Sequence, residues 1–81
     1  MSNLGNAYAL ATVLYARDTK LAIEELSENI YHAVDVLEFG EDERKADLYA
    51  QLEENLTASL PFNQAVEIIE AAMDNTDRRF P

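Results

Sequence analysis

The amino-acid sequence predicts an all-α protein, a compact bundle of three to four helices joined by short loops. Apolar residues recur every three or four positions over most of the chain, which is the spacing of one helix face. Glycine and proline each occur only twice, so a β-rich fold would lack residues for its turns. With 81 residues, 48% of them hydrophobic, we expect residues 1–81 to form one helical domain. Because the loops are short, neighbouring helices should pack antiparallel.

The first helix is predicted over residues 3–17. Its apolar face carries Leu4, Ala7, Leu10, Ala11 and Leu14 at steps of three and four residues. Aromatic and apolar side chains also cover much of its remaining surface. This pattern fits either a central helix surrounded by the other three or a helix that forms an interface. A core this small gains from a partner, so we expect a homodimer interface. Its predicted residues are Tyr8, Leu10, Val13, Leu14 and Tyr15.

The second helix is predicted over residues 19–39. Its apolar seam is Ile23, Leu26, Ile30, Ala33 and Leu37, with strictly alternating steps of three and four. Gly40 follows and suits the left-handed conformation found after a helix C-terminus. Asp18 or Thr19 could cap this helix. The alternative is one helix over residues 3–39, a rod of roughly 55 Å at 1.5 Å per residue, which a second chain would have to cover.

The third and fourth helices are predicted over residues 42–60 and 62–74. The third helix begins with acidic residues that interact favourably with the positive N-terminal end of its dipole, namely Glu41, Asp42 and Glu43. Pro61 separates the two helices because the residue before a proline avoids helical geometry. The inward positions are Leu48 or Tyr49, Leu52, Leu56 and Leu60 on the third helix, and Ala65, Val66, Ile69, Ala72 and Met73 on the fourth. Residues 75–81 are predicted to form a short tail.

The net charge of −10 limits the partners that this chain can bind. Phosphates of nucleic acids and anionic membrane surfaces would repel it, so we expect no direct contact with either. Residues 2–16 are uncharged, but this run is shorter than the ~20 residues that a membrane-spanning helix needs. A secretory signal carries Lys or Arg before its apolar run, and none precedes this run. We therefore expect a cytoplasmic protein.

Acidic residues recur at helical spacing and predict exposed acidic ridges. We expect six of them to bind a partner: Glu24, Glu28 and Asp35 on the second helix, and Glu43, Asp47 and Glu54 on the third. The fourth helix adds Glu67, Glu70 and Asp74. These ridges either serve only solubility or imitate a polyanion that enters the basic groove of a nucleic-acid-binding protein, as a class of viral inhibitors does.

Catalytic and metal-binding motifs are weak in this sequence. The absence of cysteine excludes disulfides, thiolate zinc sites and thiol nucleophiles. Glu28, His32 and Asp35 could approach one metal ion from a helix face, but metal sites in helical bundles repeat a Glu-x-x-His step on two helices. We therefore expect no enzyme activity, no cofactor and no metal. The sequence predicts a protein-binding module that acts as an inhibitor, adaptor or regulatory subunit, with polyanion mimicry as the alternative and a small metal-binding protein as a remote one.

Overall fold

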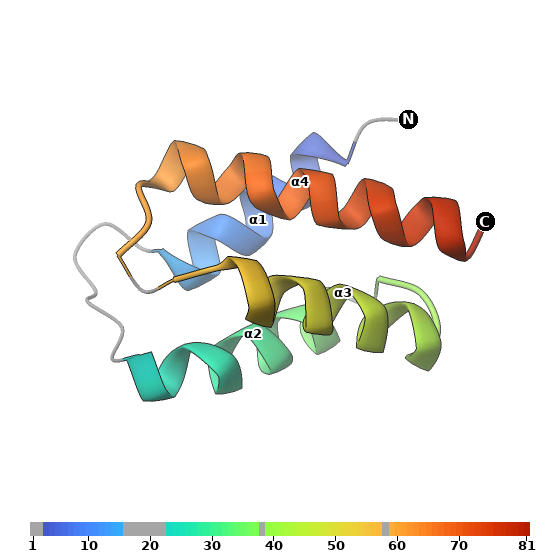
Figure 1. The fold of residues 1–81 in the computed structure, drawn as a ribbon, viewed down its shortest axis with the longest axis horizontal. Helices are drawn as coiled ribbons and strands as arrows, with labels where there is room; N and C mark the ends of the chain where they lie inside the picture. Colours follow the sequence, from blue (N-terminus) through green and yellow to red (C-terminus); the bar gives the residue numbers. More distant parts are fainter. Residues whose placement is uncertain (1–2, 16–22, 38, 58) are drawn as a thin grey trace.

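The computed structural model contains four α-helices and confirms the predicted all-α class (Figure 1). They are α1 (Leu4–Leu14), α2 (Ile23–Leu37), α3 (Asp42–Asn55) and α4 (Phe62–Arg79). The structure describes residues 3–15, 23–37, 39–57 and 59–81, and at residues 23–25 and 27 it describes the backbone alone. No strand occurs within these ranges.

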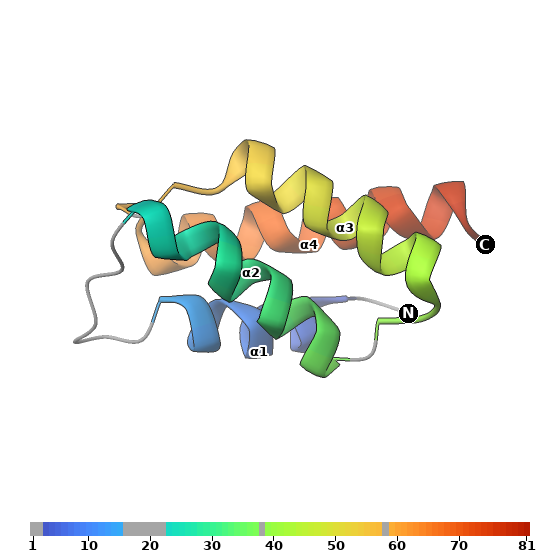
Figure 2. The same ribbon diagram turned by 90° about the horizontal axis from the view of Figure 1, so that it is seen from below.

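Each helix packs against two others, so that the four helices form a ring. α1 contacts α2 and α4, and α3 contacts the same two helices. Consecutive helices run in opposite directions, as Figures 1 and 2 show, which confirms the predicted antiparallel packing. The helices enclose one apolar core, and the Cα radius of gyration of the bundle is 11.6 Å. The buried apolar residues are Ala7, Leu10, Ala11, Leu14, Leu26, Ile30, Ala33, Val34, Leu48, Leu52, Leu56, Ala65, Val66, Ile69, Ala72 and Met73.

The alternative of a single helix over residues 3–39 is wrong. α1 ends at Leu14, and Tyr15 leaves helical geometry with φ −125° and ψ 46°. α2 then packs beside α1 instead of continuing it (Figure 2). The predicted end of the first helix at residue 17 and the predicted start of the second at residue 19 lie outside the described residues.

Three predicted helix ends differ from the structure. The second helix was expected to reach residue 39, but α2 ends at Leu37 and Phe39 is not helical. The third helix was expected to reach residue 60, but α3 ends at Asn55 because Leu56 is extended, with ψ 143°. The fourth was expected to end at residue 74, but α4 continues to Arg79. The predicted tail is wrong because Thr76 is fully buried, and its hydroxyl donates a hydrogen bond to Asp47 Oδ2 at 2.8 Å. A polar segment that resembles a loop in sequence is thus helical, since α3 supplies partners for its side chains.

The turn between α2 and α3 depends on Gly40 and Arg44. Gly40 has φ +98°, a left-handed conformation that side chains other than glycine rarely adopt. The Arg44 guanidinium lies 5.0 Å from the centre of the Phe39 ring and donates hydrogen bonds to the Phe80 carbonyl and to Asp77. Arg44 therefore joins the turn to the C-terminal end of α4.

The start of α1 is tied to the same end of α4. The Asn3 side-chain amide donates hydrogen bonds to Asp74 Oδ1 at 2.9 Å and to Asp77 Oδ2 at 2.8 Å. The hydrogen bond from Asn3 and those from Arg44, together with the charge of Arg44, lower the pKa of Asp77 despite its partial desolvation.

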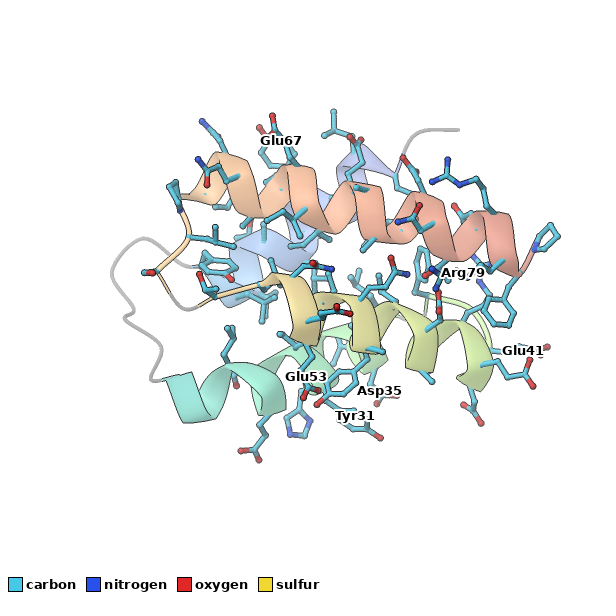
Figure 3. The ribbon with its side chains drawn as sticks, in the orientation of Figure 1. Tyr31, Asp35, Glu41, Glu53, Glu67 and Arg79 are labelled. Atoms are coloured by element: carbon cyan, nitrogen blue, oxygen red, sulfur yellow. The ribbon has the colours of Figure 1, made fainter. Side chains whose placement is uncertain are left out.

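Carboxylates lie on several sides of the bundle instead of forming one face. Figure 3 shows Glu67 on α4 and Asp35 on α2 pointing to opposite sides. Several basic side chains form ion pairs within the fold. Arg44 pairs with Asp77, Lys45 with Asp35, and Arg79 with Asp47.

Candidate protein-docking groove

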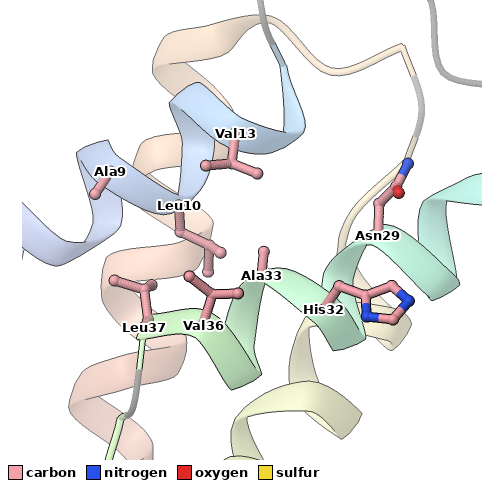
Figure 4. A pocket seen from close by; sticks show the side chains of 8 residues that line it. All are labelled: Ala9, Leu10, Val13, Asn29, His32, Ala33, Val36 and Leu37. Carbon is pink, nitrogen blue, oxygen red and sulfur yellow. The ribbon is translucent and has the colours of Figure 1, made fainter.

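An apolar groove lies between α1 and α2 (Figure 4). It has a volume of about 310 Å³ and is lined by Ala9, Leu10 and Val13 from α1, and by Asn29, His32, Ala33, Val36 and Leu37 from α2. The lining contains no Lys, Arg, Asp or Glu, although the chain carries 22 of these residues. The groove is therefore a nearly neutral surface on a strongly anionic protein.

The sizes of the side chains explain why the groove forms. Ala9 and Ala33 carry only a methyl group where the two helices face one another, so they leave the space above Leu10 unfilled. Val13 follows Ala9 by one helical turn, and Val36 follows Ala33 by three residues, which places both valines along the groove. Their side chains remain 66% and 80% exposed, respectively. A partner that covered both valines would remove apolar surface from water.

Further apolar surface continues over α1. Leu4 is 45% exposed and Tyr8 is 48% exposed. The Tyr8 ring contacts Phe62 of α4 with a centroid distance of 5.7 Å, so this surface extends from the groove towards α4. The interpretation of the first helix as the centre of the bundle is wrong, because α1 packs against α2 and α4 only and its outer side stays exposed.

The five predicted interface residues separate into two groups. Tyr8 and Val13 are exposed and Tyr15 is half-buried, so a partner can contact all three. Leu10 and Leu14 are 0% and 1% exposed. Both side chains belong to the core of the single chain, which corrects the assignment of Leu14 to an exposed interface. Leu10 forms only the floor of the groove.

Four of the six predicted acidic partner-binding residues are exposed: Glu28, Asp35, Glu43 and Glu54. Asp35 is engaged by Lys45, whose Nζ lies 3.3 Å from Asp35 Oδ1. The side chain of Glu24 lies outside the described part of the structure.

Asp47 is the exception, and its assignment to an exposed ridge is corrected. Its side chain is only 17% exposed and faces α4. Thr76 and Gln51 donate hydrogen bonds to Asp47 Oδ2 at 2.8 and 3.0 Å, and Arg79 donates to Oδ1 at 2.6 Å. Desolvation by burial raises the pKa of Asp47, but these three hydrogen bonds and the charge of Arg79 outweigh it, and the pKa is lowered.

A second hollow lies between α2 and α3, with a volume of about 380 Å³. It is more polar than the first, since Asp35, Asp42 and Lys45 line it. Tyr31 and Tyr49 form its aromatic part, with ring centroids 5.6 Å apart and planes at 87°. Asp35 and Lys45 pair with each other here, so the charged groups of this hollow largely satisfy one another.

The three residues of α2 that were weighed as metal ligands, Glu28, His32 and Asp35, do not converge. Glu28 Oε1 lies 3.9 Å from His32 Nε2, and both side chains are more than half exposed. Asp35 is directed instead to Lys45 on α3. Within the described ranges, no group of three or more His, Asp or Glu side chains could hold a metal ion.

Sequence reasoning missed Val36, which has the largest exposed fraction of the large hydrophobic side chains described. It lies outside the strict three-four seam of α2 and interrupts the polar side of that helix. An isolated valine on a polar helix side was the available signal. Val36 becomes part of an apolar groove only because α1 places Val13 on the other side.

No protein-family model, curated protein or solved structure matches this chain. Among the helical residues described, no helix is long and apolar enough to cross a membrane.

Proposed function

We propose that this chain is a non-catalytic protein-binding module that docks an apolar helix of another protein chain in the groove between α1 and α2. It would act as a small inhibitor, adaptor or regulatory subunit. The observation that carries this proposal is the nearly neutral groove with Val13 and Val36 exposed along it. Grooves between helices are a recurring docking site for amphipathic helices, which insert apolar side chains at helical spacing.

The extent of the groove supports a short helical segment as the bound element. Its lining runs from Ala9 to Val13 on α1 and from Asn29 to Leu37 on α2, so the longer wall extends for roughly 12 Å, or about two helical turns. Gly5 and Ala9 are exposed on α1, and a Cβ placed on Gly5 would meet no atom within 4 Å. A docked helix could therefore approach the backbone of α1 closely. The proposed setting is the cytoplasm, where a net charge of −10 opposes binding to nucleic acids and anionic membranes.

Affinity capture with matched variants tests this function. The groove variant carries Val13→Asp and Val36→Asp, and the control carries Ala50→Asp and Ala71→Asp at exposed positions of α3 and α4. Both variants add two negative charges, so they differ in location and not in net charge. Mass spectrometry of proteins captured from the native cells should find partners that the wild type and the control retain and the groove variant loses. Equal capture by all three proteins would refute the groove as the docking site.

A polyanion mimic is the second candidate, supported by the exposed carboxylates of two neighbouring helices. Glu28 and Asp35 on α2 and Glu43 and Glu54 on α3 are exposed, and α2 packs against α3. Such a mimic would compete with duplex DNA for its target and would lose affinity as salt is added. Replacing Glu28, Glu43 and Glu54 by lysine should abolish this competition and leave the helical circular dichroism unchanged. Competition that survives the triple replacement would exclude mimicry by these ridges.

A further inference from the structure

The N-terminal segment of the sequence contains no charged side chain. Every residue from Met1 to Ala16 is uncharged, so all acidic and basic residues lie in residues 17–81. α1 lies within the uncharged segment and forms one wall of the groove. The net charge of −10 therefore belongs to α2, α3, α4 and the segments that join them.

This distribution bears on what can occupy the groove. A basic partner would gain from carboxylates, and the groove lining has none. The lining favours a helix that is uncharged, apolar on its outer side and able to approach closely. α1 of the same chain has these properties, because it has no charged residue and exposes Leu4, Tyr8 and Val13.

Self-association is also consistent with the position of α1. α1 is both a wall of the groove and an exposed helix, so a two-fold axis beside it can place each α1 against the groove of the other chain. Two molecules that each carry −10 repel one another over about 8 Å at physiological ionic strength. Contact through the uncharged helices keeps the carboxylates of α3 and α4 on the outer sides of the pair.

We propose that the groove between α1 and α2 is filled by α1 of a second copy of this chain, in a two-fold symmetric homodimer. This inference rests on the proposed function, since it names the chain that occupies the same groove. The dimer would present the acidic surfaces of α3 and α4 twice, on opposite sides. Those surfaces would then be the ones available to further partners.

Equilibrium sedimentation of the purified chain is the first test. The wild type and Ala50→Asp should be dimers, whereas Val36→Asp should raise the dimer dissociation constant at least about tenfold, because it buries a carboxylate in an apolar interface. Val36 is 80% exposed in the single chain, so the variant should keep its fold. Raising the salt concentration should strengthen the wild-type dimer severalfold, since the net repulsion is screened. A basic partner surface would show the opposite response.

Spin labelling gives a second measurement that does not depend on a destabilising variant. The chain has no cysteine, so Thr12→Cys or Ala71→Cys each introduces one labelling site, on the exposed part of α1 or of α4. Labelled chains are mixed with an excess of isotope-labelled wild type. A label at position 12 should broaden amide signals of α1 and α2 in the second copy, and a label at position 71 should not.

A monomeric wild type, a dimer unaffected by Val36→Asp, or a dimer weakened by salt would overturn the homodimer. If the wild type is monomeric but Val13→Asp with Val36→Asp still loses a captured partner, the homodimer fails and the docking function stands. If neither sedimentation nor capture responds to the groove variants, both fail.

Discussion

Between α3 and α4, Asp47, Gln51 and Thr76 exchange hydrogen bonds, whereas the side chains that line the groove between α1 and α2 are mostly apolar. The first pair is further joined by Arg79 to Asp47 and by Arg44 to Asp77. Directional bonds hold α3 and α4 in one register, because a shift along either helix would leave buried polar groups without partners. Apolar contacts tolerate sliding and exchange of neighbours more readily.

The two halves therefore suit different tasks. The α3–α4 half has satisfied its polar groups internally, and every buried side-chain nitrogen or oxygen described has a hydrogen-bond partner. The α1–α2 half retains exposed Val13 and Val36 beside an unfilled groove. The chain thus combines a hydrogen-bonded half with a half that leaves apolar side chains exposed. Substitutions that separate these properties can test the comparison.

The largest effect on stability is expected from Gly40→Ala, in the turn between α2 and α3. A Cβ at position 40 would lie 2.5 Å from Arg44 Cδ, and the backbone φ of +98° is itself unfavourable for alanine. We expect a loss of about 1–3 kcal/mol in the free energy of unfolding, measured by urea denaturation. Gly5→Ala is the control, since its Cβ meets no atom; Gly5 lies in the first turn of α1, so the change should stay within about 0.5 kcal/mol. Equal effects at the two glycines would contradict the role of the Gly40 turn.

The second largest loss of stability is expected from Thr76→Val, which alters the hydrogen-bond network between α3 and α4. The variant keeps the side-chain shape but removes a hydroxyl that donates to Asp47 and accepts from Gln51. The loss should be about 1–2 kcal/mol, because polar groups remain partly buried without a partner. Thr12→Val serves as the control at an exposed site of α1, where the change should stay within about 0.5 kcal/mol. Similar losses at both positions would show that the network does not stabilise the fold.

Acid should weaken the α3–α4 half in particular. The pKa values of Asp47 and Asp77 are lowered below the ordinary 3.8 in the folded chain, so the folded state favours their ionised forms. Their contribution to stability is present above the unfolded pKa and is lost as the pH falls through the folded pKa. Urea denaturation from pH 6 down to about pH 2 should show this decline.

Asparagine at positions 47 and 77 should flatten that acid decline. The matched control is Glu54→Gln with Glu67→Gln, which neutralises two exposed carboxylates and should leave most of the decline in place. If the control flattens the curve as much as the asparagine pair does, the number of carboxylates and not the hydrogen bonds of Asp47 and Asp77 governs the acid response.

The smallest effect is expected on α2, from His32→Ala. His32 and Glu28 form an ion pair only when the imidazole is protonated, and their side chains are 68% and 75% exposed. Exposed pairs of this kind stabilise a helix by less than about 0.5 kcal/mol. Urea denaturation should therefore give nearly the same free energy of unfolding for the variant and the wild type. A difference above about 1 kcal/mol would place His32 among the residues that hold the fold.

The helical class and the core faces could be predicted from the sequence because the three-four spacing is a local property of each helix. Leu26, Ile30 and Ala33 of the predicted seam are buried, as are Leu48 and Leu52 of α3. Gly40 was correctly expected to follow the second helix with a left-handed backbone. These predictions required no knowledge of which helices become neighbours.

The remaining features depend on residues that are distant in sequence. Asp47 has the spacing of an exposed ridge, and only Thr76 and Arg79, about 30 residues away, draw it towards α4. The same partners keep residues 75–79 helical, where the sequence suggested a tail. The groove combines Val13 with Val36, so its existence follows from the packing of two helices and not from either helix alone.

Tyr15 offers an optical probe of the joint between the two halves. It follows the last residue of α1, and its hydroxyl donates a hydrogen bond at 2.8 Å to the carbonyl of Thr57, just after α3. Partial burial raises the pKa of this phenol, and ionisation would remove the donated proton. Because the chain contains no tryptophan, the ultraviolet absorbance of its four tyrosines can be followed without interference. The difference between the alkaline titrations of the wild type and of Tyr15→Phe would thus report, without any added dye, when the hydrogen bond between the end of α1 and the segment that follows α3 is lost.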